Sequence, residues 1–146
     1  MQTFTDNGGR DWQVKVNPIT LGKIEQTTGE SFSADPEDGE GPIVRIATDC
    51  MYAFQVLWVL CEAQANERGV SSEDFGDALV GDVLGKAQAA LCEAIADFYP
   101  DPARREAVRR VFSVIKAAEA KLLAKASKQL DDLDVDQLVE DVTNGG

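Results

Sequence analysis

The sequence contains no histidine among its 146 residues, so it lacks the side chain that most often acts as a general base near neutral pH. The Ser-His-Asp and Cys-His arrangements of nucleophilic enzymes are therefore excluded, together with most catalytic zinc sites. The glycines form neither the G-x-x-x-x-G-K-[ST] nor the G-x-G-x-x-G pattern that cradles phosphates. We therefore expect a protein that is not an enzyme, with no catalytic residues, no metal and no cofactor.

Cysteine is also scarce: Cys50, Cys61 and Cys92 are the three in the chain, and no C-x-x-C pair occurs. An odd number of cysteines with no apparent signal peptide does not predict a disulfide framework. All three lie in apolar stretches, so we expect buried, unreactive thiols in a reducing compartment.

Long apolar runs are missing as well. The longest, residues 50–61, is interrupted by Gln55, and a helix needs roughly twenty apolar residues to cross a bilayer. The formal net charge of -12 repels phosphate backbones and anionic lipid headgroups. We therefore expect neither a membrane nor a nucleic acid as the partner.

Helix-forming residues crowd the second half of the chain, and the sequence predicts a mostly α fold with a small N-terminal β-hairpin. The hairpin is expected over residues 1–16, where apolar and polar residues alternate after a glycine-containing turn. Trp12, Val14 and Val16 form its apolar side, and Phe4 is expected to face Trp12.

A short helix is predicted over residues 17–29, capped by Asn17 and stopped by Gly29. Residues 30–47 contain acidic residues mixed with glycine and proline, which predicts an acidic loop. The final stretch, 131–146, has six acidic and no basic residues and is expected to be a flexible acidic tail.

A helical bundle is predicted over residues 48–130, which completes a single domain running from residue 1 to 130. Thr48 is expected to cap a central apolar helix that ends near Arg68. Ser71 opens a short helix through Val80, and a further helix ends at Phe98. The longest helix is predicted from Pro102 to Leu130.

This long helix is the one basic element, because residues 101–130 carry eight basic and three acidic side chains. At about 100° per residue, one face gathers the apolar side chains and basic residues lie on both of its flanks. The apolar face holds Val108, Val111, Phe112, Ile115, Ala118, Leu122 and Ala126. The basic flanks hold Arg105, Arg109, Arg110, Lys116, Lys121, Lys125 and Lys128, which are the predicted partner-binding residues.

Two interpretations of these basic flanks remain open. In the first, long basic side chains cover the edges of a buried stripe and balance the acidic remainder of the chain. In the second, the helix, once its acidic tail moves aside, presents an apolar groove with basic rims to a partner helix.

Several stretches resemble the tail assembly chaperones of long-tailed bacteriophages. They are LWVLCEAQA at residues 57–65, RGVSSEDF at residues 68–75 and ALVGD at residues 78–82. The chain is also similar in opening with Phe-Thr-Asp before a glycine turn, and in ending its alanine-rich helix at Phe-Tyr-Pro over residues 98–100. The resemblance covers residues 4–130.

The resemblance implies a chaperone that binds the tape measure protein and keeps it soluble until the tail tube polymerises. It also implies the tail tube protein as a second partner, action in the host cytoplasm during assembly, and absence from the mature virion. A head-to-tail connector or tail completion protein retained in the virion is the alternative, and a nucleic-acid-binding regulator is a third hypothesis. Self-association stays open.

Overall fold

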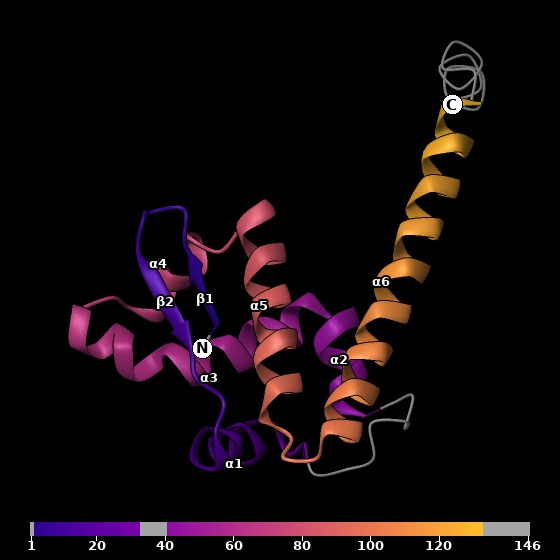
Figure 1. Ribbon diagram of the computed structural model, residues 1–146. Helices are drawn as coiled ribbons and strands as arrows, with labels where there is room; N and C mark the ends of the chain where they lie inside the picture. Colours follow the sequence, from indigo (N-terminus) through magenta and orange to yellow (C-terminus); the bar gives the residue numbers. More distant parts are fainter. Residues whose placement is uncertain (1, 33–40, 133–146) are drawn as a thin grey trace. The chain divides into compact units, whose positions relative to one another are not determined.

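A computed structural model describes residues 2–32 and 41–132 of the chain, and it confirms a mostly helical protein with an N-terminal hairpin and a long last helix. The order of the elements follows the chain (Figure 1). The elements are β1 (Gln2–Thr5), β2 (Asp11–Val14), α1 (Pro18–Thr28), α2 (Pro42–Thr48), α3 (Cys50–Arg68), α4 (Ser72–Asp77), α5 (Asp82–Phe98) and α6 (Pro102–Asp131).

The chain divides into two compact units after Ile115, whereas the sequence predicted one domain running to residue 130. The first unit, called the body, holds every element before α6 and the first half of that helix. The second unit begins at Lys116, and its helical residues 116–131 are called the arm. The predicted flexible tail begins at Asp131, which still ends α6, and its residues 133–146 lie outside the described part of the chain.

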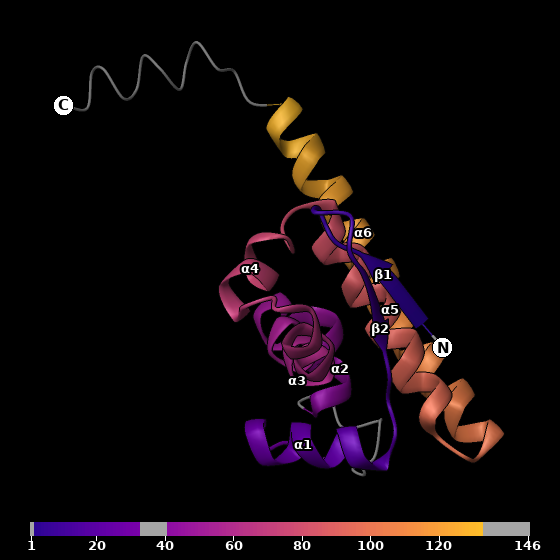
Figure 2. The ribbon, with the colours of Figure 1, turned by 90° about the vertical axis from the view of Figure 1, so that its left-hand side faces the viewer.

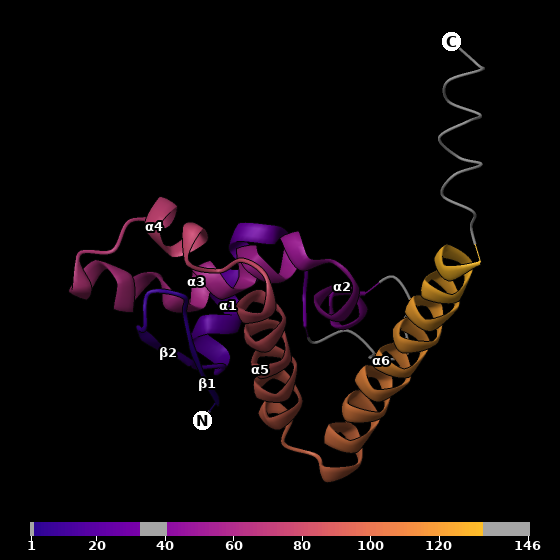
Figure 3. The ribbon, with the colours of Figure 1, turned by 90° about the horizontal axis from the view of Figure 1, so that it is seen from above.

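The hairpin pairs β1 with β2 in antiparallel register, and Phe4 lies opposite Trp12 as predicted. Figures 1 and 3 show β1 between β2 and α5, while β2 packs against α3. Gln64 of α3 bonds both backbone groups of Gln13, with distances of 3.0 and 2.9 Å. These bonds from a helix side chain close the outer edge of β2, which would otherwise be open to another strand.

The carboxylate of Asp6 holds the hairpin turn. It accepts bonds from the backbone N–H groups of Gly8 and Arg10, and from the side chains of Arg10 and Trp12, all between 2.9 and 3.1 Å. Burial alone would raise the pKa of Asp6, but the four bonds outweigh it and hold that pKa below its ordinary value. The turn is therefore fixed by a charged group that is only 4 % exposed.

Helix α1 has the predicted ends. The side chain of Asn17 accepts from the backbone of Ile19 and Thr20, each at 2.9 Å, and Gly29 ends the helix with a φ of 77°. That left-handed conformation costs glycine little because it has no Cβ.

The predicted acidic loop over residues 30–47 is wrong at its C-terminal end, where Pro42–Thr48 form helix α2. Ile43 and Ile46 lie one turn apart and are 2 % and 0 % exposed, so burying them supports a helix that follows directly after the breaker residues. The remainder of that prediction, residues 33–40, falls outside the described part of the chain.

The prediction that Thr48 caps the central helix is also wrong. The hydroxyl of Thr48 donates to the carbonyl of Val44 inside α2, at 2.9 Å. Asp49 caps α3 instead, because its carboxylate accepts from the backbone of Met51 and Tyr52 at 3.0 and 3.2 Å.

Helix α3 is the centre of the body, as its apolar sequence predicted. Figure 2 looks along it and shows α1 and α4 on opposite sides. Its fully or nearly buried side chains are Tyr52, Ala53, Val56, Leu57, Leu60, Cys61 and Ala65. Within the described residues no single helix has the length and apolarity of a membrane span. Helices α2 and α3 taken together have that length and apolarity, but the two helices meet at a bend of 107°.

Helix α4 begins after the predicted Ser71 cap, whose hydroxyl accepts from the backbone of Asp74 at 3.1 Å. It ends at Asp77, three residues before the predicted Val80. Phe75 is fully buried, with its ring centroid 5.0 Å from that of Trp12, and this contact ties α4 to the hairpin.

The three cysteines differ in burial. Cys61 is buried, which raises its pKa to about 12 and keeps it protonated near neutral pH, and Cys92 is half-buried. The prediction of a buried Cys50 is wrong, because that residue opens α3 and is exposed. An apolar neighbourhood in sequence does not bury the first residue of a helix.

Candidate partner-binding surface

The last helix, α6, begins at a cap that the sequence encodes. The carboxylate of Asp101 accepts from the backbone N–H of Ala103 at 3.0 Å, and Pro102 occupies the first helical position, where no N–H is needed. The helix then runs through Ala, Arg, Lys and Leu, which are among the best helix formers, to Asp131.

The first half of α6 belongs to the core of the body. Val108 is fully buried, and Val111 and Phe112 pack half-buried against the same core. These side chains are the first part of the predicted apolar face, so the body uses that part for its own packing.

Two of the predicted partner-binding residues in this half already bond to the body. Arg109 forms an ion pair with Asp97 and a longer one with Glu93 at 3.8 Å, both on α5. The guanidinium of Arg105 donates to the carbonyls of Tyr99 and Pro100 at 2.9 and 3.1 Å. These arginines tie the start of α6 to the end of α5.

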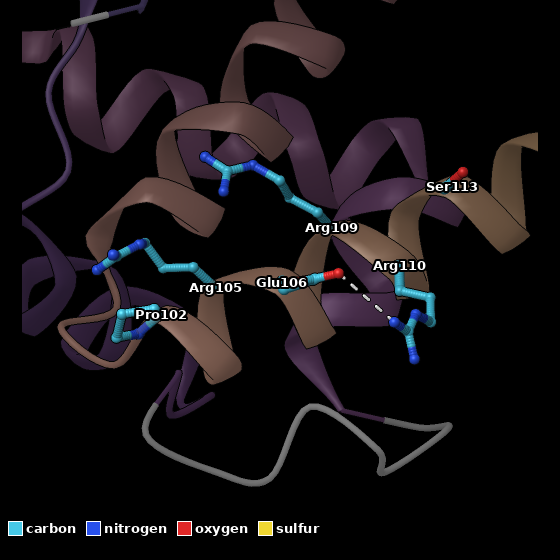
Figure 4. Close-up of a pocket in the computed structure, with 6 residues that line it drawn as sticks. All are labelled: Pro102, Arg105, Glu106, Arg109, Arg110 and Ser113. Atoms are coloured by element: carbon cyan, nitrogen blue, oxygen red, sulfur yellow. Dashed lines mark ion pairs between the residues drawn. The ribbon is translucent and has the colours of Figure 1, made fainter.

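Arg110 differs from these two because its ion pair stays within α6. Its ion pair with Glu106 spans 3.6 Å within the same helix, and both side chains are 75 % exposed (Figure 4). An ion pair this exposed contributes little to stability.

A shallow concavity lies over these first turns of α6. Figure 4 shows Arg105 and Arg109 extending to one side of it and Arg110 to the other. It is lined by Pro102, Arg105, Glu106, Arg109, Arg110 and Ser113. Because all six come from one helix, this is an open face that cannot enclose a small substrate.

The arm is exposed at every position from Lys116 to Asp131. Leu122, Leu123 and Leu130 are 67 %, 71 % and 66 % exposed. An exposed leucine is ordinary by itself, and these three lie on one face of the helix.

The side chains of the arm fall on two sides of the helix at about 100° per residue. Leu122, Leu123, Ala126 and Leu130 span about 100° and form the leucine face, near whose middle Glu119 also lies. Lys125 borders one flank of this face and Lys116 the other, while Lys121 and Lys128 lie toward the back of the helix. These four lysines make no ion pair and no side-chain hydrogen bond with any residue that the structure describes.

The predicted set of seven basic residues is therefore divided. Arg105, Arg109 and Arg110 belong to the body, and the four lysines belong to the arm. Leu123 and Leu130 were missed as members of the apolar face. At about 100° per residue, Leu130 lies at the same angle as Phe112 and Leu123 lies about 20° beyond it, so the predicted face continues onto these two leucines.

Within residues 2–32 and 41–132, no group of three or more Cys, Asp or Glu side chains is placed to hold a metal ion. The most heavily bonded carboxylate in the body, that of Asp6, is fully occupied by the hairpin turn.

Comparison with known proteins gives no relative: no protein-family model, no curated protein and no solved structure matches the chain.

Proposed function

We propose that this protein is a non-catalytic assembly chaperone that binds a helical partner through the arm. The observation that carries the proposal is the leucine face, with Leu122, Leu123 and Leu130 at least 66 % exposed on a regular helix. Helix-in-groove recognition uses apolar anchors at this spacing.

The energetics suit a reversible contact. Burying one leucine side chain contributes roughly 1.5–3 kcal/mol, so three leucines supply a useful but limited driving force. Much of it offsets the loss of freedom on association, which keeps the affinity of one arm for one partner segment moderate. A chaperone that must later be displaced needs contacts of this strength.

The resemblance of residues 4–130 to phage tail assembly chaperones supplies the identity of the partner. On that basis the arm binds segments of the tape measure protein and keeps them soluble in the host cytoplasm until tube subunits replace the chaperone. The tail tube protein is the second partner that the resemblance implies.

Co-expression with the tape measure protein tests this proposal. The wild-type chain should raise the soluble fraction of the partner and co-purify with it. The variant Leu122→Ser/Leu123→Ser/Leu130→Ser should lose both effects, because it removes the leucine face without touching the body.

The matched control removes three exposed apolar side chains of the body, in the variant Ile19→Ser/Met51→Ser/Val80→Ser, where they are 71 %, 65 % and 57 % exposed. This control should bind like the wild type. Equal co-purification of the arm variant, or a tape measure protein that stays insoluble in every case, would contradict the proposal. Recovery of the chain from purified virions would favour the connector alternative.

A further inference from the structure

We propose that the arm selects partner helices whose apolar stripe is flanked by acidic side chains. This inference rests on the proposed function and adds the chemistry of the partner. It follows from the charges around the leucine face and from what those charges contact in the structure.

The arm and the body carry opposite net charge. Residues 116–131 contain four lysines against Glu119 and Asp131, a net charge of +2. Residues 1–115 contain ten basic and nineteen acidic side chains, a net charge of -9. The arm is thus a local basic element in an acidic protein.

The lysines of the arm make no ion pair with any residue in 2–32 or 41–132. In the body, Arg109 is neutralised by Asp97 and Glu93, and Arg10 by Asp6. In the arm, Lys125 and Lys116 border the leucine face and have no described counterpart. Lys121 and Lys128 lie farther round, but a lysine stem can lie along an apolar surface while its ammonium group reaches outward.

A partner helix laid on the leucine face would therefore place its own flanks beside Lys116 and Lys125. Acidic flanks would form opposite-charge pairs there, whereas basic flanks would bring like charges together as leucine is buried. Juxtaposed like charges at an interface act against the wrong partner, so the lysines contribute selectivity more than affinity.

Other occupants fit the charges less well. A second copy of the arm would bring its own Lys116 and Lys125 beside the same face, where like charges would meet. An anionic membrane or a nucleic acid would attract the arm, but it would repel a body of net charge -9.

Three labelled amphipathic peptides test the inference, with identical leucine positions and with flanks of Glu, Gln or Lys. Their binding to the full-length chain is measured by fluorescence anisotropy at low and high salt. We expect the Glu peptide to bind about tenfold more tightly than the Lys peptide at low salt, since two flanking pairs contribute up to about 1 kcal/mol each. The difference should shrink as salt screens the exposed charges.

Charge reversal sharpens this test. The variant Lys116→Glu/Lys125→Glu should reverse the order and prefer the Lys peptide. The control variant Lys23→Glu/Lys86→Glu changes two exposed lysines of the body by the same total charge and should keep the wild-type order.

Each alternative outcome is distinct. If all three peptides bind equally and the leucine substitutions abolish binding, the acidic selectivity is wrong and the proposed function stands. If binding survives the leucine substitutions, charge alone attracts the peptide and the inference is overturned. Arm-dependent pelleting with phosphatidylserine vesicles, or an arm-dependent dimer in sedimentation, would instead assign the face to a membrane or to a second copy. If no peptide binds and the tape measure protein co-purifies without the leucines, both proposals fail.

Discussion

The two halves of α6 belong to one continuous helix and each carries four basic side chains, yet they differ in what surrounds them. In the body half, Val108 is fully buried and Arg109 is paired with two carboxylates. In the arm half, Leu122 is 67 % exposed and Lys125 has no described partner. An amphipathic pattern therefore predicts that the apolar face of a helix will be buried. It does not say whether the same chain or another molecule buries that face.

The largest expected difference between the two regions concerns their carboxylates. Asp6→Asn should destabilise the protein by about 3 kcal/mol, because the new amide places a donor where Arg10 and Trp12 both donate. Glu119→Gln, on the exposed arm, should change stability by less than about 0.5 kcal/mol. Urea unfolding measures the free energy of unfolding of both variants. Equal losses of stability in the two variants would contradict the expected difference between body and arm.

The stability that the Asp6 carboxylate contributes should also depend on pH. Because the pKa of Asp6 is lowered in the folded state, its contribution to stability is present above the ordinary value of 3.8 and is lost as the pH falls through the folded pKa. The stability gap between wild type and Asp6→Asn should therefore narrow between pH 7 and pH 3. Thermal melts at both pH values test this, and a constant Asp6→Asn gap would contradict it.

The second difference concerns apolar side chains. Val108→Ala should cost about 2 kcal/mol, because it leaves a cavity in the core. Leu122→Ala removes more atoms but should cost less than about 0.5 kcal/mol, because the side chain is already hydrated. A larger loss for Leu122→Ala in denaturant unfolding would show that the arm is packed in solution.

The smallest difference concerns cations. Arg109→Ala removes two exposed ion pairs with α5 and should cost about 0.5 kcal/mol. Lys125→Ala should have no measurable effect on stability and should weaken partner binding. Calorimetric melts combined with a pull-down separate the two roles, and a pull-down defect confined to Arg109→Ala would move the binding surface to the body.

Much of the fold could be predicted from local chemistry. The hairpin register followed from alternation, and the ends of α1 followed from Asn17 and Gly29, because both signals act within a few residues. Helix α2 was missed because its propensity is weak and its support is tertiary, from Ile43 and Ile46 in the core. Cys50 was wrongly predicted to be buried for a related reason: burial of a side chain depends on where the residue lies in the fold.

The candidate surface was only partly predictable. The basic and apolar stripes of α6 were visible in the sequence, and the structure places both on the helix. The boundary after Ile115 was not visible, because the same periodicity continues across it and only packing distinguishes Val108 from Leu122. Leu123 and Leu130 matter only once that boundary is known.

Hydrogen exchange along α6, measured with and without the co-expressed tape measure protein, tests the central claim most directly. In the free chain, amides near Val108 should be protected and amides from Lys116 to Leu130 should exchange readily, because few packed side chains support the arm. In the complex, the arm should gain strong protection while the body half of α6 stays unchanged. Protection gained only in the body, or an arm that exchanges equally fast in both states, would contradict the account.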